Sequence, residues 1–356
     1  MKKLLSALLV VAMLLMGVAA FAEDTFEIAL VTDVGNIDDQ SFNQSAWEGV
    51  VEFAEANGYT KAYYRPSEDS TTARMESIKT AVEKGAKVIV CPGYLFEEAI
   101  YNVQDEYPEV NFLLLDGEPH NADYSDYKTG SNVHNILYQE EQAGYLAGYA
   151  AVKDGYTKLG FLGGMAVPAV IRYGFGFVQG ADAAAAELGT PIEINYTYGG
   201  QFHGDANITA KMEGWYAAGT EVVFACGGGI YTSAVEAAKL HNGKVIGVDV
   251  DQSYIDECIV TSAMKQLQNV TETVLDALNN GDWATYGGKV SNFSLAEGEY
   301  VGLPTDADSW RLSTFTVDEY EALKAKLADG SVVVDNNSDD NVKPTVSDKT
   351  TVNYIG

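Results

Sequence analysis

The sequence predicts an α/β protein made of two similar Rossmann-like lobes with parallel sheets. Short apolar runs rich in β-branched residues alternate along the chain with segments of helical period. Several of these segments occur twice, in the same order and at a nearly constant offset. The length of 356 residues suits two domains, and 47% hydrophobic with 21% charged residues is a globular composition.

The predicted strands are apolar on both faces, which is typical of strands buried in a parallel sheet. They cover residues 26–32, 87–91, 111–115, 158–162, 221–225 and 244–248. Helical patterns lie between them, at 42–57, 71–83, 96–106, 170–188, 207–218 and 230–241. Because strands and helices alternate, the strands are expected to be parallel and joined by right-handed crossovers.

An internal repeat relates the two halves of the chain. The matching positions recur in the same order at offsets of 131 to 135 residues. They pair Gly49 with Gly180, Gly58 with Gly189, residues 85–91 with 219–226, and residues 114–116 with 247–249. One or two such matches could arise by chance in any α/β chain, but the ordered set favours two lobes of one design.

The repeat predicts the domain limits. The first lobe is expected near 27–130 and the second near 131–259. A helix pattern from Met264 to Leu278 predicts that residues 260–288 return to the first lobe, and residues 289–335 would rejoin the second. These returns require a hinge of several strands. Residues 336–356 are expected to form an acidic, polar tail.

Residues 1–22 have the features of a secretory signal peptide. Lys2 and Lys3 precede an apolar run, and Ala20-Phe21-Ala22 is a small-x-small cleavage site. An uncleaved anchor is the alternative, although the run is short for a bilayer span. We therefore expect export to the periplasm or to the outer face of the cytoplasmic membrane. No cysteine for lipid attachment stands at the cleavage site.

Charge and composition exclude several classes of function. The chain has 22 Lys and Arg against 51 Asp and Glu, a formal net charge of −29. Such an acidic chain is not expected to bind nucleic acid, which requires positive potential. Three cysteines and four histidines show no metal-binding spacing, so neither a metal nor a cofactor is predicted.

The candidate site lies where the predicted strands end, because ligands of open parallel sheets bind beyond the carboxyl ends of the strands. Asp33, Asp116 and Asp249 follow three of the six strands, and glycines, including Gly227, follow the others. Each aspartate could instead cap the next helix. Carboxylates accept hydrogen bonds, so the site should prefer a neutral ligand rich in hydroxyl or N–H groups.

The segment after Asp33 predicts the start of a helix. Ser41 and Gln44 have the spacing of a capping box, and Asp38 and Asp39 favour the positive helix end. We therefore expect mainly structural roles for Asp38, Asp39 and Ser41.

Aromatic residues lie near the starts of two predicted helices. Phe42 and Asn43 are left facing the crevice of the first lobe. The second lobe has a similar aromatic segment near a helix start, residues 173–177, directly after Arg172; we call each of these two segments an aromatic entry. Such rings could be core residues, or they could sandwich a planar ligand. Carboxylates alone would suit a sugar, whereas carboxylates with two aromatic entries suit a nucleoside better.

Five segments together resemble a known family. They are residues 33–44 (an aspartate- and glycine-containing stretch ending in Ser-Phe-Asn-Gln), 140–148 (Glu-Glu-x-x-Gly-Tyr-Leu-Ala-Gly), 160–164, 176–180 and 245–252. Their order is similar to that of the basic membrane protein (PnrA-like) family of ABC-transporter substrate-binding proteins, from about residue 26 to 335. The resemblance implies a type I periplasmic-binding-protein fold with a purine nucleoside between the lobes.

The resemblance also implies roles for individual residues. Asp33 would bond the base, Asn43 and Asp116 would help to orient it, and Asp249 would hold the ribose hydroxyls. The other implied contacts are stacking by Phe42 and Phe177, close backbone approach at Gly227, and a ribose contact from Lys265. For Lys265 a solvated helix lysine is the alternative. The family is usually lipid-anchored, and here the anchoring cysteine is missing.

The implied function is that of a non-enzymatic receptor for an ABC importer. Its partners would be a nucleoside and a membrane permease, and the protein itself would be a monomer. One alternative keeps the fold and changes the ligand to a sugar or a furanose signal. A calcium-dependent nucleoside hydrolase is the other, because the aspartates between residues 33 and 39 superficially resemble its metal-binding cluster.

Overall fold

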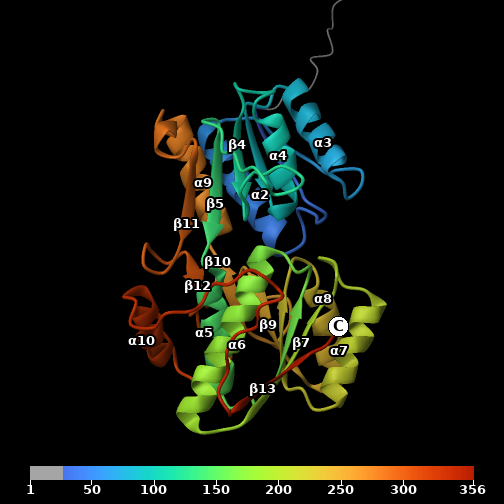
Figure 1. Cartoon of the computed structure of the whole chain (residues 1–356), viewed down its shortest axis with the longest axis vertical. Helices are drawn as coiled ribbons and strands as arrows, with labels where there is room; N and C mark the ends of the chain where they lie inside the picture. Colours follow the sequence, from blue (N-terminus) through green and yellow to red (C-terminus); the bar gives the residue numbers. More distant parts are fainter. Residues whose placement is uncertain (1–26) are drawn as a thin grey trace, which may run out of the picture.

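The computed structural model describes residues 27–356, and the predicted signal peptide lies outside this range. The chain folds into two α/β lobes that are stacked along the long axis of the molecule (Figure 1). This confirms the predicted fold class.

The first lobe contains a six-stranded parallel sheet in the order β11-β5-β4-β3-β1-β2. Its strands are β1 (Ile28–Val31), β2 (Lys61–Tyr64), β3 (Val88–Pro92), β4 (Asn111–Leu115), β5 (Val133–Tyr138) and β11 (Lys289–Phe293). One face is covered by α2 (Phe42–Asn57) and α9 (Leu267–Asn279), and the other by α3 (Thr71–Glu83) and α4 (Glu97–Val103).

The second lobe contains a seven-stranded sheet in the order β12-β10-β9-β8-β6-β7-β13. Its strands are β6 (Lys158–Gly163), β7 (Ile192–Tyr198), β8 (Val222–Cys226), β9 (Lys244–Asp249), β10 (Ile259–Lys265), β12 (Val301–Gly302) and β13 (Thr350–Tyr354). Only the β10–β12 pair is antiparallel among the described strands.

The helices of the second lobe cover both faces of its sheet. On one face lie α5 (Glu140–Lys153) and α6 (Pro168–Leu188), and on the other lie α7 (Ala206–Ala217) and α8 (Tyr231–His241). The last helix, α10 (Val317–Ala328), packs against α5. Two short 3₁₀ turns lie in the first lobe, at Tyr94–Phe96 and Trp283–Thr285.

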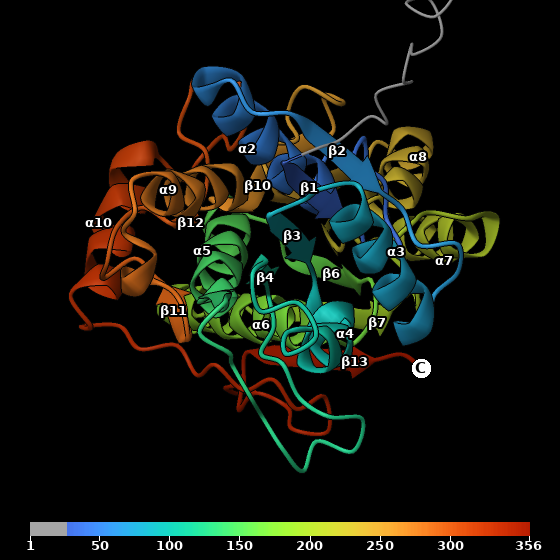
Figure 2. The same cartoon turned by 90° about the horizontal axis from the view of Figure 1, so that it is seen from above.

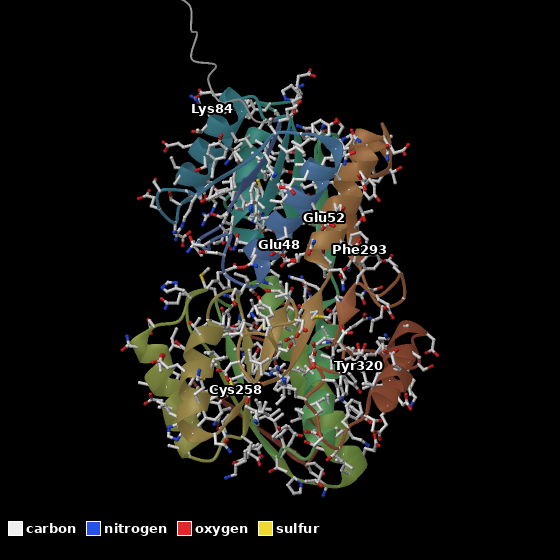
Figure 3. The ribbon with its side chains drawn as sticks, turned by 180° about the vertical axis from the view of Figure 1, so that it is seen from behind. Glu48, Glu52, Lys84, Cys258, Phe293 and Tyr320 are labelled. Carbon is white, nitrogen blue, oxygen red and sulfur yellow. The ribbon has the colours of Figure 1, made fainter. Side chains whose placement is uncertain are left out.

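The chain crosses between the lobes three times, after β5, after β10 and between β11 and β12. The crossings are hydrogen-bonded to one another: the Gln139 amide donates to the Phe293 carbonyl, and the Gln266 amide donates to the Tyr300 carbonyl, both at 2.9 Å. In Figure 3, Phe293 lies near the junction of the two halves, whereas Cys258 and Tyr320 lie well inside the second lobe. These crossings form the expected multi-strand hinge.

Several expected domain limits are wrong. Strand β5 (Val133–Tyr138) belongs to the first sheet, so that lobe runs to residue 138 rather than 130. Strand β10 (Ile259–Lys265) belongs to the second sheet, and the return to the first lobe begins with α9. Strand β11 (Lys289–Phe293) pairs with β5 and not with the second sheet. Apolar runs and turn signals do not reveal which strand lies beside which, so pairing at these sheet edges was not predictable.

The C-terminal segment also differs from the expected tail. Residues 350–354 form β13, which pairs in parallel with the edge strand β7 (Figure 2). The Ile355 amide donates to the Tyr196 carbonyl at 2.8 Å, and the Ser347 amide donates to the Asp182 carboxylate at 3.0 Å. The polar composition predicted a solvated tail. Instead, main-chain hydrogen bonds to the open edge of the sheet determine the conformation of this segment.

Glycines allow α5 and α6 to pack unusually closely. A Cβ at Gly144 would lie 2.1 Å from the Tyr173 carbonyl oxygen, and one at Gly180 would lie 1.9 Å from that of Tyr145. Gly148 and Gly176 meet backbone atoms of the opposite helix at similar distances. These glycines belong to two of the motifs that resemble the family, and their spacing brings the start of α5 against the first turns of α6.

Within residues 27–356, no helix has the length and apolar character needed to cross a membrane.

Candidate functional site

A cavity lies between the two lobes at the carboxyl ends of their strands. The space between atoms there, open solvent included, is about 620 Å³. The first lobe contributes Asp33, Gly35, Asp39, Phe42, Asn43, Gly93, Tyr94, Leu95 and Asp116. The second contributes Val167, Ala169, Val170, Tyr173, Phe202, Cys226, Gly227, Gly228, Val248, Asp249 and Lys265.

Two aspartates occupy matching positions in the lobes. Asp116 follows β4 and Asp249 ends β9, and their φ angles of 61° and 66° are in the left-handed region. This conformation is uncommon for residues other than glycine and costs free energy, so its occurrence at two facing positions is typical of a functional site. Oδ1 of Asp116 is buried and has no hydrogen-bond partner among the described residues.

Lys265, at the end of β10, supplies the positive charge of the cavity. Its side chain forms an ion pair with Asp116 of the opposite lobe, and its Nζ lies 3.3 Å from Glu140 Oε1 and 4.0 Å from Asp249 Oδ1. The same Nζ lies 4.8 Å from the centroid of the Phe42 ring, which also contacts the cavity. The lysine is 3% exposed and is therefore not a solvated helix residue.

Hydrogen bonds connect four residues in the part of the cavity wall that belongs to the first lobe. Asn43 donates from Nδ2 to Asp33 Oδ1 at 3.0 Å and to Asp39 Oδ2 at 3.1 Å. The Gly35 amide donates to the same Asp33 oxygen at 2.7 Å. Both of these bonds are accepted by Oδ1, and neither involves the second oxygen of Asp33.

The predicted capping box is wrong in its details. Asp39, not Ser41, caps α2, because its carboxylate accepts from the backbone amides of Ser41, Asn43 and Gln44 at 2.9 to 3.1 Å. Ser41 instead donates from Oγ to Asp249 Oδ2 of the opposite lobe at 2.6 Å. Sequence spacing alone could not distinguish a serine that caps its own helix from one that bonds another lobe.

Polar contacts across the cleft show that the lobes are closed. They are the Ser41–Asp249 bond, the Lys265–Asp116 ion pair, and a bond of 2.9 Å from Gln252 Nε2 to the Gln40 carbonyl. Two of the three use carboxylates of the cavity, so closure and the charges of the site are directly linked.

Burial changes the ionisation of the site. Desolvation raises the pKa values of Asp33, Asp116 and Asp249 to about 6. Burial by itself would lower the pKa of Lys265, but Asp116, Glu140 and Asp249 raise it above its ordinary value. The lysine is therefore charged at neutral pH, and the carboxylates are mostly ionised.

The structure brings seven of the eight predicted site residues to one cavity: Asp33, Phe42, Asn43, Asp116, Gly227, Asp249 and Lys265. Phe177 lies elsewhere. It is 0% exposed, and its ring packs against Phe224 and Phe161 in the core of the second lobe at centroid distances of 5.4 and 6.3 Å. The expected stacking role for Phe177 is therefore corrected, because its ring faces the sheet and not the cleft.

Three aromatic cavity residues were not singled out from the sequence. Tyr173 lies four residues before Phe177 in α6, one helical turn nearer the cavity, within the aromatic entry that the sequence did indicate. Tyr94 and Phe202 come from a 3₁₀ turn and a loop, where no periodic pattern marks them. The Tyr173 hydroxyl has no hydrogen-bond partner in the described part of the chain.

Residues 26–337 match the family described as ABC transporter substrate-binding protein, PnrA-like. The chain belongs to this family. Among its relatives is the "ABC transporter nucleoside-binding protein BmpA" of Lactococcus lactis, 28% identical, in an alignment covering 89% of this chain and 91% of that protein. Another is "Basic membrane protein A" of Borreliella burgdorferi, 26% identical over 91% of each chain.

Solved structures show the same fold. A solute-binding protein of an ABC transporter system from Aeropyrum pernix superposes with a TM-score of 0.75 at 22% identity, covering 89% of this chain and 95% of that one. The Lac repressor superposes at 0.56 with 12% identity, over 84% of each chain. At these identities the likeness concerns the fold, which is the type I periplasmic-binding-protein fold.

Family membership establishes the general role. The family consists of extracytoplasmic substrate-binding proteins of ABC transporters, which work with a membrane permease and are not catalysts.

Proposed function

We propose that this protein binds a nucleoside, in particular a purine nucleoside, in the cavity between its lobes and delivers it to an ABC importer. The observation that carries the proposal is the pairing of aromatic rings with carboxylates in one cavity. Phe42 and Tyr94 come from the first lobe, and Tyr173 and Phe202 from the second. Flat aromatic surfaces suit a base, and carboxylates suit hydroxyl and N–H donors.

The proposed contacts follow from this geometry. Asp33 would accept from N–H groups of the base with its second oxygen, and Phe42 would stack on the base. Asp249 and Lys265, on the second lobe, would contact the ribose hydroxyls. Asp116 would orient the ligand through Oδ1. The name of the Lactococcus lactis relative supports a nucleoside over other neutral ligands.

The test is a calorimetric panel of inosine, guanosine, adenosine, their 2′-deoxy forms, ribose and arabinose. We expect the nucleosides to bind and free ribose to bind far more weakly. A 2′-deoxynucleoside should lose roughly ten- to a hundredfold in affinity, because a buried carboxylate is left without a donor. Ribose binding as tight as that of guanosine would indicate a sugar receptor instead.

We also propose that the bound nucleoside leaves unchanged. Inosine incubated with the protein and calcium should be recovered intact. Release of free base that disappears on Asp38→Ala would favour the hydrolase alternative.

A further inference from the structure

Glu140 lies behind the cavity and does not form part of its wall. It is the first residue of α5 and is wholly buried. Its Oε1 lies 3.3 Å from Lys265 Nζ, and its Oε2 accepts a bond of 2.7 Å from Arg172 Nε. One carboxylate thus joins a cation that lines the cavity to a second cation on α6 that does not.

The partners of Lys265 differ in which lobe carries them. Asp116 belongs to the first lobe, so its ion pair with Lys265 exists only when the lobes are closed. Glu140 and Asp249 belong to the second lobe with Lys265 and stay beside it when the cleft opens. Of these two, Glu140 is the nearer, at 3.3 Å from the ammonium, and Asp249 is the more distant, at 4.0 Å. A buried ammonium without a partner is very unfavourable, so Glu140 is the partner that Lys265 keeps.

The two helices that carry Glu140 and Arg172 are closely packed. A Cβ at Gly176 would lie 2.0 Å from the Glu141 carbonyl oxygen, so the start of α5 is pressed directly onto α6. This contact fixes Glu140 relative to Arg172. Burial would raise the pKa of Glu140, but Arg172 and Lys265 hold it below its ordinary value, and the carboxylate remains charged.

We propose that Glu140, held by Arg172, is a positioning residue that fixes the Lys265 ammonium at the junction of the lobes in both the open and the closed state. Lys265 is then in place to meet the ligand and Asp116 when the cleft closes. This inference rests on the proposed nucleoside binding and adds a residue that acts on the ligand only through Lys265.

The first test is a double-mutant cycle on inosine affinity, measured by calorimetry at neutral pH. Glu140→Gln and Lys265→Met should each weaken binding by about tenfold or more. Because Glu140 acts through Lys265, the double variant should bind within about threefold of Lys265→Met alone. Glu141→Gln is the matched control: the next residue of α5 is also buried, forms no ion pair with another described residue, and should leave affinity within about twofold.

The outcomes separate positioning from general stability. Additive losses in the double variant, or unchanged affinity in Glu140→Gln, would overturn the proposal. If Glu140→Gln does not fold, Glu140→Asp keeps the charge on a shorter side chain. It should fold and still bind inosine several-fold more weakly, and wild-type affinity in that variant would equally overturn the proposal.

A measurement without ligand distinguishes this inference from the nucleoside proposal. In protein labelled with ¹⁵N-lysine, an ammonium held in buried ion pairs exchanges slowly and gives a sharp Nζ signal, assigned by its loss in Lys265→Met. We expect the signal in the wild type and in Glu141→Gln but not in Glu140→Gln. Its persistence in Glu140→Gln would exclude positioning, whereas a wild type that shows the signal but binds no nucleoside would refute only the proposed function.

Discussion

The two lobes share a backbone design but present different chemistry to the cleft. From β2 and β7 inward, their sheets follow the same order, so β1 corresponds to β6, β3 to β8, β4 to β9 and β5 to β10. Asp116 and Asp249 hold matching places with nearly equal φ angles. At the end of β1, however, the first lobe has Asp33, where the second has glycines after β6.

The difference is largest beside the hinge. Strand β5 ends at Tyr138 and strand β10 at Lys265. A glutamine follows each strand, Gln139 or Gln266, and directly precedes a helix of the other lobe. Tyr138 and Lys265 thus occupy equivalent places, and the lysine Nζ lies 5.4 Å from the tyrosine ring centroid. At this place in the repeated backbone, the first lobe carries the aromatic ring of Tyr138 and the second lobe carries the charged side chain of Lys265. Repetition therefore sets where the cleft lies, and divergence of the side chains sets the chemistry that the cleft presents.

Replacing Phe177 or Phe42 by alanine compares a core ring of the second lobe with a cavity ring of the first, and the loss of stability in Phe177→Ala is the largest effect that we expect. Phe177→Ala should reduce the free energy of unfolding by about 3–5 kcal/mol, because it empties a core position of the second lobe. Phe42→Ala should cost less stability, because part of its ring contacts the cavity, and should weaken nucleoside binding by about 1–3 kcal/mol. Denaturant unfolding and calorimetry of both variants check this. The opposite pattern would place the stacking ring in the second lobe.

The close helix pairs of the two lobes offer a second comparison. Gly180→Ala forces a Cβ to within 1.9 Å of a backbone oxygen, whereas at Gly49, between α2 and α9, the corresponding distance is 2.6 Å. We expect losses of about 1–3 kcal/mol or more, larger for Gly180→Ala than for Gly49→Ala. Gly214→Ala is the control. Beyond the backbone of its own helix and its two chain neighbours, no atom lies within 4 Å of a Cβ there, and alanine should stabilise α7 slightly. Thermal melts would refute the packing argument if all three variants behaved alike.

The third prediction concerns pH. The pKa values of Asp33, Asp116 and Asp249 are raised to about 6, so their contribution to the stability of the ligand-free protein is present at low pH and is lost as pH rises through about 6. Nucleoside affinity should change in the opposite direction, because ionised carboxylates are the better acceptors. Below pH 6 it should fall by up to about tenfold per unit for each group required.

Melting curves with and without guanosine between pH 5 and 8 measure both effects. Asp33→Asn and Asp249→Asn show which lobe carries the pH dependence. A guanosine-induced shift in melting temperature that does not change with pH would contradict the prediction.

The smallest expected effect concerns the bond between the lobes. Ser41→Ala removes the donor to Asp249 and should reduce nucleoside affinity about three- to tenfold by making the closed state less favourable. Ser45→Ala, four residues further along α2 and outside the cavity wall, should have no effect on affinity. Small-angle scattering should show a larger mean radius of gyration for ligand-free Ser41→Ala than for Ser45→Ala. Equal radii and equal affinities would show that this bond does not hold the lobes together.

The sequence by itself determined the architecture and seven of the residues that line the cavity. Period and composition are local properties, and they predicted α2 and α3 with the bounds that the structure has. The aspartates that follow buried strands were predicted to meet at one edge, because parallel strands place their carboxyl ends together. The motifs that resemble the family were also visible, although the reason for their glycines was not.

Only the tertiary structure decided relations between distant residues. It placed β5 and β11 in the first sheet and β13 beside β7, since edge pairing depends on neighbours and not on the strand's own pattern. It placed Phe177 in the core and Tyr173 at the cavity, because the two residues lie one helical turn apart along the same face of α6. It also joined Ser41 to Asp249 across the cleft and Lys265 to Glu140 within the second lobe, and both contacts span more than 100 residues of the chain.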